Sequence, residues 1–296
     1  MSRHRPFYTD VQSHYDLNDD FFGLFLDPTR TYSCAYWKEP GYTLEQAQIA
    51  KIDLALGKCG LEPGMTLLDI GCGWGSTMLR ALDAYQVNVV GLTLSRNQYD
   101  YVSALLRERQ GGGGHGEVLL AGWEEFEGRV DRIVSIGAFE HFRSERYDDF
   151  FDFAYRAMPA DGIMLLHTIV AYGRDYLREN GIRLTHEDLE FVRFIRETIF
   201  PGGQLPRPWG RVPRGVREYA EAGGFTVTQI QALQPHYART LDHWAAALTE
   251  HNDEAVAIAG QDTVDNYQHY LTGSAEQFRN GLIDVMQFTC AKTSSA

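Results

Sequence analysis

The sequence predicts an α/β fold in which helices cover both faces of a mostly parallel sheet. Short apolar strands alternate with helical segments from residue 66 to residue 167. The first of these strands leads directly into a loop with three glycines, the residue type used where backbone turns tightly and approaches a ligand. The chain has 296 residues, of which 44% are hydrophobic, so one large domain or two small ones can form without disulfide or metal support.

The N-terminal part of the chain is predicted to be helical. Val11–Phe25 carries closely spaced apolar and aromatic residues around acidic ones. Leu44–Leu56 places apolar side chains on one helical face, and Thr43 with a glutamine three residues later forms a capping-box pattern at its start. Between the two lies an aromatic loop, Thr31–Tyr36.

The core elements follow in a regular order. Five strands are predicted at 66–70, 87–92, 117–121, 130–136 and 162–167, with helices at 76–85, 97–109 and 146–158. Two more strands, at 225–233 and 284–290, complete a seven-stranded sheet. The glycine tract 111–114 is predicted to be a turn. Outside the alternation lie helical insertions, including 187–199 and 240–280, and a loop rich in Pro and Gly at 201–215.

Composition argues against several classes of partner. Lys and Arg number 27 against 40 Asp and Glu, a net charge of −13, so we expect no nucleic-acid partner. The start of the chain has no apolar signal sequence, and its longest apolar-rich run is far shorter than the ~20 residues of a membrane span. The four cysteines have neither metal-site nor disulfide spacing, which predicts reduced thiols, no metal site and a cytoplasmic location.

The strongest local motif is LLDIGCGWG at 67–75, in which a strand ends in Asp69 and then in Gly71, Gly73 and Gly75. The spacing is GxGxG rather than the GxGxxG of dinucleotide sites, and the Gly-Lys-Ser/Thr ending of a phosphate loop is absent. It resembles motif I of class I S-adenosylmethionine (SAM) methyltransferases. That resemblance implies that the backbone approaches the methionine part and that the acid helps to hold the α-amino group. A tight turn without a ligand is the alternative.

Two later segments suit a nucleoside. After the second strand, Thr93, Leu94 and Gln98 offer neutral groups where many SAM enzymes place an acid against the ribose. After the third strand come Trp123 and Glu124. An indole can stack on adenine, and an acid can accept a hydrogen bond from its amino group. A plain core position is the alternative for Trp123.

Together these segments resemble the cyclopropane-mycolic-acid synthase family of SAM-dependent methyltransferases over nearly the whole chain. The resemblance implies a Rossmann-like class I fold and transfer of methyl carbon to double bonds of very long acyl chains. The implied product is a cyclopropane or a methyl branch, formed through a carbocation. It is carried by VQSHYDLNDDFFGLFLD (11–27), TYSCAYW (31–37), EQAQIAKIDLALGK (45–58), LEPGMTLLDIGCGWGS (61–76), NVVGLTLSRNQ (88–98), DRIVSIGAFEHF (131–142), LLHTI (165–169), IFPGGQLP (199–206), LQPHYARTLDHWAAAL (233–248) and YLTGSAEQFRNG (270–281).

The resemblance also implies the site residues. SAM is expected to contact Tyr32, Ser33, Asp69, Gly71, Gly73, Gly75, Thr93, Leu94, Gln98, Trp123 and Glu124. A bicarbonate ion that acts as the base is expected beside the methyl group, in contact with Gly137, Glu140, His167, Tyr237 and the backbone of Cys34. Glu140 would meet a hydroxyl of this ion or orient His167, which is predicted at the end of the fifth strand, where open parallel sheets bind ligands. The family commonly has cysteine where this chain has Ser274, a further catalytic candidate.

The implied substrate is an unsaturated meromycolyl chain on an acyl carrier protein or a related thioester. The alternatives are the same fold acting on another lipid or a secondary-metabolite alkene, and a SAM- or lipid-binding protein without turnover. We expect one domain, with a helical lid at 1–60, a SAM-binding core at 61–169, and acyl-chain-binding insertions at 170–215 and 240–281.

Two side-chain groups complete the predictions. Aromatic faces stabilise cations, and the candidates to line the acyl cavity are Tyr15, Tyr32, Tyr36, Phe139, Phe142, Phe200, Tyr237 and Tyr270. For any single one of them a plain core position is the favoured alternative. A local basic cluster is a hypothetical docking patch for an acidic carrier, with a solvated face as the alternative: Arg193, Arg196, Arg207, Arg211, Arg214 and Arg217. Peripheral contact with a membrane is a further alternative.

Overall fold

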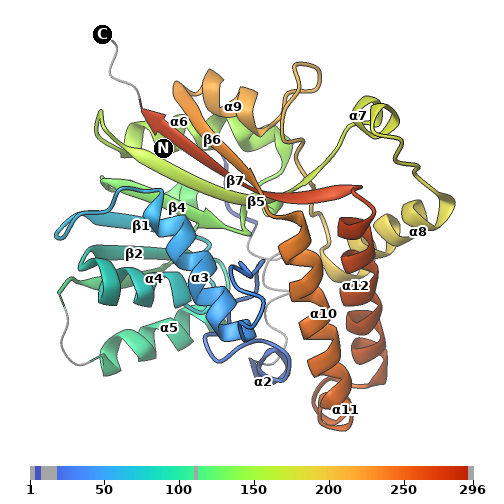
Figure 1. Ribbon diagram of the computed structural model, residues 1–296. Coiled ribbons are helices and arrows are strands. Elements are labelled where there is room, and N and C mark those ends of the chain that lie inside the picture. The colour runs from blue at the N-terminus through green and yellow to red at the C-terminus, as the bar shows by residue number, and fades with distance from the viewer. Residues whose placement is uncertain (1–3, 8–18, 110–112, 293–296) are drawn as a thin grey trace.

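The computed structural model describes residues 4–7, 19–109 and 113–292 (Figure 1). Its centre is a seven-stranded sheet with the order β3-β2-β1-β4-β5-β7-β6. Strands β1 to β5 pair in parallel, and β7 runs antiparallel to both of its neighbours. The predicted α/β class, number of strands and mostly parallel pairing are confirmed.

The strands lie close to their predicted positions. They are β1 (Thr66–Ile70), β2 (Asn88–Thr93), β3 (Gly116–Leu120), β4 (Arg132–Ile136), β5 (Ile163–Ala171), β6 (Phe225–Ala232) and β7 (Ile283–Lys292). The largest difference is at β5, which continues past its predicted end because its last residues pair with β7. The prediction that His167 ends the strand is therefore wrong. His167 does lie opposite Ile136, the last residue of β4, so the parallel part of the sheet ends beside it.

The helices are α2 (Asp19–Gly23), α3 (Leu44–Gly57), α4 (Ser76–Arg80), α5 (Arg96–Glu108), α6 (Tyr147–Ala157), α7 (Arg174–Glu179), α8 (His186–Phe194), α9 (Val216–Ala222), α10 (Gln234–Glu250), α11 (Asn252–Ala259) and α12 (Gln261–Arg279). Two predicted helices, 76–85 and 187–199, change at their ends into π-helical turns, Ala81–Tyr85 and Ile195–Ile199. Most of the predicted helix 11–25 lies outside the described residues, as does Tyr15. The predicted capping box at Thr43 is confirmed. None of the helices in the described part of the chain combines the length and apolar character that a membrane crossing needs.

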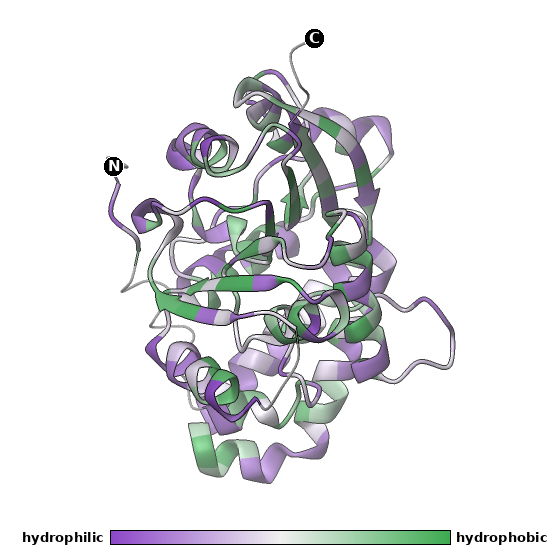
Figure 2. Ribbon diagram, turned by 90° about the vertical axis from the view of Figure 1, so that its left-hand side faces the viewer, coloured by the Kyte–Doolittle hydropathy of each residue, from purple (hydrophilic) through white to green (hydrophobic). Residues whose placement is uncertain are grey.

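Alternation of side chains along the strands builds a core on each face of the sheet. Leu67 of β1 and Leu165 of β5 pack with α3, α4 and α5, whereas the next residues, Leu68 and Leu166, pack with α6 and α9. Figure 2 shows the green of apolar residues concentrated in the strands, while the helices carry both green and purple. These two cores fix the carboxyl ends of β1 to β5 in space.

A third core joins the N-terminal segment to the C-terminal helices. Phe21 and Phe22 of α2 are fully buried among side chains of α10, α11 and α12, including Trp244 and Tyr267. In Figure 1, α10 and α12 extend side by side away from the sheet, with α11 at their far end and α2 nearby. Helical segments far apart in the sequence therefore form one unit beside the carboxyl edge of the sheet.

Candidate active site

One cavity lies at the carboxyl ends of β1 to β4. It collects residues from the aromatic loop, the glycine loop and the segments that follow β2, β3 and β4. Ten of the predicted SAM contacts line it, namely Tyr32, Ser33, Asp69, Gly71, Gly73, Thr93, Leu94, Gln98, Trp123 and Glu124. We call this space the first cavity.

The three glycines of the loop have different surroundings. All have positive φ, but a Cβ on Gly73 (φ 56°) would meet no atom within 4 Å, although Gly73 lines the first cavity. A Cβ on Gly71 would lie 2.4 Å from the Cβ of Ala138, and one on Gly75 would lie 3.0 Å from Val102. Gly75 is not among the residues that line the cavity, and its missing side chain allows α4 to approach α5, so its contact with SAM stays a prediction.

A buried pair of opposite charges lies beneath the glycine loop. Asp69 is 2% exposed, its Oδ2 has no hydrogen-bond partner, and burial raises its pKa to about 7 against the opposing effect of Lys51. Lys51 of α3 is 1% exposed and donates to the Ser33 hydroxyl at 2.8 Å, and burial lowers its pKa to about 8. Lys51 also lines the first cavity, and the sequence analysis missed it. The available signal was a lysine on the apolar face of a helix.

The far end of the first cavity is polar and aromatic. The Thr93 hydroxyl donates to Gln98 Oε1 at 2.8 Å. Trp123 packs against Phe150 of α6 and also lines the cavity, so it is both a core residue and a site residue. Its indole N–H is buried without a partner. The Trp123 indole therefore offers both a ring face and an unpaired N–H, which suits a ligand whose flat ring carries acceptor atoms.

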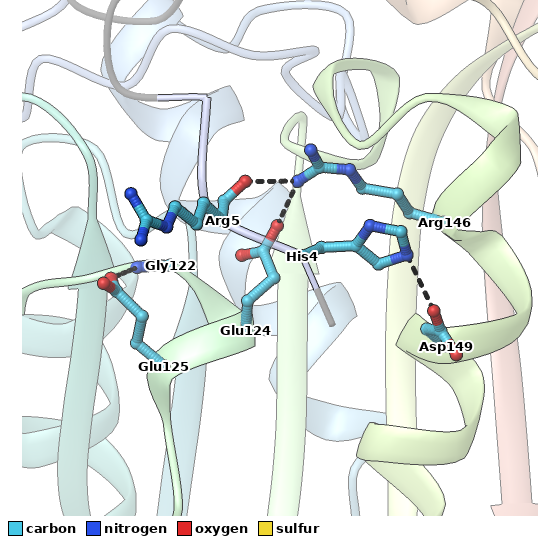
Figure 3. A network of polar contacts seen from close by, with 7 residues as sticks. All are labelled: His4, Arg5, Gly122, Glu124, Glu125, Arg146 and Asp149. Carbon is cyan, nitrogen blue, oxygen red and sulfur yellow. Dashed lines mark hydrogen bonds and ion pairs between the residues drawn. The ribbon is translucent and has the colours of Figure 1, made fainter. Parts of the chain in front are cut away.

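Residues of the N-terminal segment cover this end. Arg146, the residue just before α6, donates to the backbone carbonyl of Arg5 at 2.7 Å and to Glu124 at 2.8 Å (Figure 3). Its guanidinium also lies 3.6 Å from the ring centre of Phe7, which lines the first cavity. The pKa of Glu124 is raised by burial, with Arg146 opposing that rise. Arg146 therefore ties the N-terminal segment to a predicted site residue.

A second, larger cavity of about 730 Å³ adjoins the first. Tyr32, Ser33, Gly137 and His141 line both cavities, so the two spaces meet at these residues. All predicted catalytic residues line the second cavity: Cys34, Gly137, Glu140, His167, Tyr237 and Ser274. His141 was missed by the sequence analysis, and burial lowers its pKa to about 4.

Glu140 and His167 each have one satisfied and one unsatisfied polar atom. Glu140 Oε1 accepts from the Ile169 backbone N–H at 2.6 Å, whereas its buried Oε2 has no partner, and burial raises its pKa to about 7. His167 Nε2 is likewise buried without a partner. Burial lowers the pKa of His167 well below its usual value, and Lys51 and Lys58 add to this. The Nδ1 of the ring pairs with Gln287, so Glu140 does not hold that nitrogen, and its role toward a bicarbonate hydroxyl or toward His167 stays a prediction.

Cys34 and Ser274 both line the second cavity, and burial disfavours the reactive thiolate form of Cys34. The Cys34 thiol is fully buried, donates to the Ala35 carbonyl at 3.2 Å and has its pKa raised well above the usual value by burial. Ser274 lies on α12 and is 9% exposed. Tyr237 of α10 packs its ring 4.8 Å from that of Phe278. These residues line the cavity as neutral groups.

The candidate aromatic residues divide between several places. Tyr32, Phe200, Tyr237 and Tyr270 line the second cavity, Phe142 lines the first, and Tyr36 lines neither. Phe139 has the core position given as its alternative, since it is fully buried and stacked on Tyr147 with ring centres 4.2 Å apart. The sequence analysis missed Phe191, Tyr172 and Tyr219, which also line the second cavity.

Comparison with known proteins decides the family. The family model "Mycolic acid cyclopropane synthetase" matches residues 2–288. The chain is 57% identical over 288 residues to cyclopropane mycolic acid synthase 1 of Mycobacterium tuberculosis, covering 97% of this chain and 98% of the relative. The chain belongs to the mycolic acid cyclopropane synthetase family. The resemblance found in the sequence and the predicted enzyme class, a SAM-dependent methyltransferase, are confirmed.

Two further relatives extend this result. Methoxy mycolic acid synthase MmaA3 of the same organism is 57% identical over 283 residues, which cover 96% of this chain and 94% of that protein. The crystal structure of the mycolic acid cyclopropane synthase CmaA1 complexed with SAH and CTAB has a TM-score of 0.93 and 57% identity, covering 98% of this chain and 99% of that one. A cyclopropane synthase and a methoxy mycolic acid synthase are thus equally similar to this chain. Overall sequence identity to the family members therefore does not identify the product of this chain.

Proposed function

We propose that this protein is a SAM-dependent methyltransferase that acts on a double bond of a very long unsaturated acyl chain, a mycolic acid precursor. The observation that carries the proposal is the junction of the two cavities. The residues expected to hold SAM line one side, and a mostly apolar space of about 730 Å³ with Glu140 and His167 lies on the other. A long alkyl chain needs such an apolar space to leave water.

The first cavity fits SAM. When bound, SAM supplies an electrophilic methyl group. Asp69 Oδ2, which is buried and unpartnered, is the acceptor we assign to the α-amino group. Gly73 leaves open space where a side chain would stand, and Trp123 offers a ring face and an unpaired N–H for the base. Gln98 and Thr93 provide neutral polar groups for the ribose.

The second cavity fits a small anion near the junction. A bicarbonate ion, when bound, supplies a base. With a pKa of about 7, Glu140 holds a proton on a large share of molecules at neutral pH and then donates a hydrogen bond. Glu140 Oε2 and His167 Nε2 are both buried, unpartnered and on the same cavity, which suits an acceptor-rich ligand.

The remaining chemistry concerns positive charge on the substrate. An alkene that gains a methyl group leaves a cation on the neighbouring carbon. Loss of a proton from the added methyl group closes a cyclopropane, and loss of a proton elsewhere leaves a methyl-branched alkene. Tyr32, Phe200 and Tyr270 line the cavity and offer aromatic faces to that charge. The apolar walls keep water away, because capture of the cation by water yields a hydroxyl group instead.

Incubation with methyl-labelled SAM and long unsaturated acyl thioesters, followed by mass analysis, tests the proposal. We expect a labelled product heavier than the substrate by one CH2 group. A product that also gains water would show capture of the cation. Transfer only to phospholipid chains or to secondary-metabolite alkenes would support the alternative acceptors. SAM binding without label transfer to any acceptor would contradict an enzymatic role and support a binding protein.

The proposed carrier of the acyl chain is an acyl carrier protein. Of the predicted basic cluster, Arg196, Arg207 and Arg214 line the second cavity, joined by the exposed Arg174. Arg214 forms an ion pair with Asp148. Basic residues at the point where an acyl cavity reaches the surface suit an acidic partner. We also propose a cytoplasmic location, which suits the four buried free thiols.

Charge reversal tests the docking patch. We expect Arg196→Glu to weaken binding of an acidic acyl carrier protein by roughly tenfold at low salt, and less at high salt because ions screen the attraction. The matched control is Arg107→Glu, an equal charge change at an exposed residue of α5 that lines neither cavity. Equal binding by the two variants in a titration at low salt would dismiss the patch. Binding to anionic vesicles instead of the carrier would favour membrane contact, since the large exposed hydrophobic residues, Leu184, Leu189, Val192, Leu205, Trp209 and Val212, lie in the same stretch.

Ser274 tests whether the family's cysteine position carries covalent chemistry. The alkene is itself the nucleophile, so no protein nucleophile is needed, and a small polar side chain only has to pack or give one hydrogen bond. We expect Ser274→Ala to lower turnover by no more than about tenfold, the scale of one neutral hydrogen bond. A loss of about a thousandfold with SAM affinity unchanged would show that Ser274 takes part in the reaction.

A further inference from the structure

A line of polar side chains crosses the sheet behind His167. In the strand register, His167 of β5 lies opposite Gln287 of β7, and Gln287 lies opposite Gln231 of β6. Directly opposed residues of antiparallel strands place their side chains on one face within contact distance. Gln287 is fully buried, and its amide nitrogen lies 3.3 Å from His167 Nδ1. His167 lines the second cavity and turns Nδ1 toward the sheet interior, which leaves Nε2 as the ring nitrogen available to a ligand there.

Lys58 fixes the orientation of the Gln287 amide. Its ammonium, at the end of α3, donates to Gln287 Oε1 at 2.6 Å and to Gln231 Oε1 at 2.5 Å. An ammonium has donors only, so each amide must turn its oxygen toward Lys58. The NH2 group of Gln287 then faces the imidazole. Because that group also only donates, His167 Nδ1 must be the acceptor.

The consequence is a defined protonation state of the imidazole. A neutral imidazole that accepts at Nδ1 carries its proton on Nε2. Burial together with the positive charges of Lys51 and Lys58 keeps the ring neutral, because all three lower the pKa of His167. The unpartnered Nε2 is thus an N–H donor aimed at the second cavity rather than a base.

We infer that Lys58 and Gln287 are positioning residues that hold His167 as the neutral Nε2–H tautomer, so that it presents a permanent hydrogen-bond donor to the reaction space. The inference rests on the proposed function for its effect on turnover, but the tautomer itself is independent of any substrate. A donor there holds an anion or a carboxyl group in place without taking the proton that the substrate releases. His167 then has no role as the proton acceptor.

Nitrogen spectra of the full chain test the tautomer directly. Protein labelled with 15N-histidine gives separate signals for protonated and bare ring nitrogens, and His167→Asn identifies the signals of His167 by their loss. We expect a protonated Nε2 and a bare Nδ1 across the neutral pH range. A protonated Nδ1 in the native protein would overturn the inference.

Substituting glutamate at Gln287 or at Gln231 separates the effect of direct contact with His167 from the effect of an added negative charge. In Gln287→Glu, the carboxylate still accepts from Lys58, now as an ion pair, but it also accepts from the ring, so Nδ1 becomes protonated. Gln231→Glu puts an equal charge beside the same ammonium without touching His167, and we expect Nδ1 to stay bare. Lys58→Met lets the amide turn and gives mixed signals, whereas Lys58→Arg restores the native pattern. An unchanged His167 spectrum in Gln287→Glu would overturn the inference.

Turnover links the tautomer to the reaction. We expect Gln287→Glu to lower turnover about 10–100-fold with SAM affinity unchanged, the scale seen where a second residue orients a ligating histidine. Gln231→Glu should stay within about threefold of the native rate. If Gln287→Glu changes the tautomer but not the rate, the positioning role is wrong. If the native protein methylates no alkene, the proposed function fails while the spectra still decide the tautomer.

Discussion

Gly73→Val is expected to abolish SAM binding while leaving the fold intact. The side chain would enter the first cavity, since a Cβ at this position meets no protein atom within 4 Å and the residue lines that space. The positive φ of 56° adds strain for a β-branched residue. We expect SAM affinity to fall by at least about a hundredfold in calorimetry, equivalent to ~2.8 kcal/mol.

A matched glycine distinguishes the effect of filling the cavity from the effect of backbone strain. Gly64 also has positive φ (88°) and no atom within 4 Å of a built Cβ, but it lies before β1 and lines neither cavity. Gly64→Val should therefore lose stability without losing SAM affinity. Unchanged affinity in Gly73→Val, or an equal loss in Gly64→Val, would remove the assignment of the first cavity to SAM.

Local sequence patterns predicted the elements whose conformation depends on interactions between nearby residues. The glycine loop and the capping box at Thr43 depend on residues within a few positions of one another, and both have the expected conformation. The alternation of strands with helices along the chain likewise predicted a sheet covered on both faces. The family motifs supplied the site residues, and the structure brings all but Gly75 to one of two adjoining cavities.

Long-range pairing explains the errors. The extension of β5 beyond His167 depends on β7, which is more than a hundred residues away in the sequence, so no local pattern could show it. The partner of the His167 ring, Gln287, comes from the same pairing. Lys51 and Phe139 show that the direction of a single side chain is also hard to predict from sequence. A charged side chain reached the site from the buried face of a helix, and an aromatic one beside Glu140 turned into the core.

The electrostatics of Glu140 decide how its variant should behave. Burial raises its pKa to about 7, so the neutral acid is the form that the folded protein favours. The stabilisation from the neutral acid is full below the unfolded pKa, ~4.3, and is lost as the pH rises through about 7. Glutamine has the shape of the neutral acid and no charge. Glu140→Gln should therefore fold normally and lose less stability than the native protein between mildly acidic and neutral pH.

Glu140→Gln is accordingly a test of chemistry rather than of folding. The amide keeps one hydrogen bond to the Ile169 N–H but cannot exchange a proton with the anion at the junction of the cavities. We expect turnover to fall by about 10²–10⁴-fold, the usual contribution of a general acid or base, with SAM affinity within a few-fold of native. The control is Glu145→Gln, the same change on an exposed residue nearby that lines neither cavity. Near-normal turnover of Glu140→Gln, measured with methyl-labelled SAM, would make Glu140 a structural residue that only holds the Ile169 backbone.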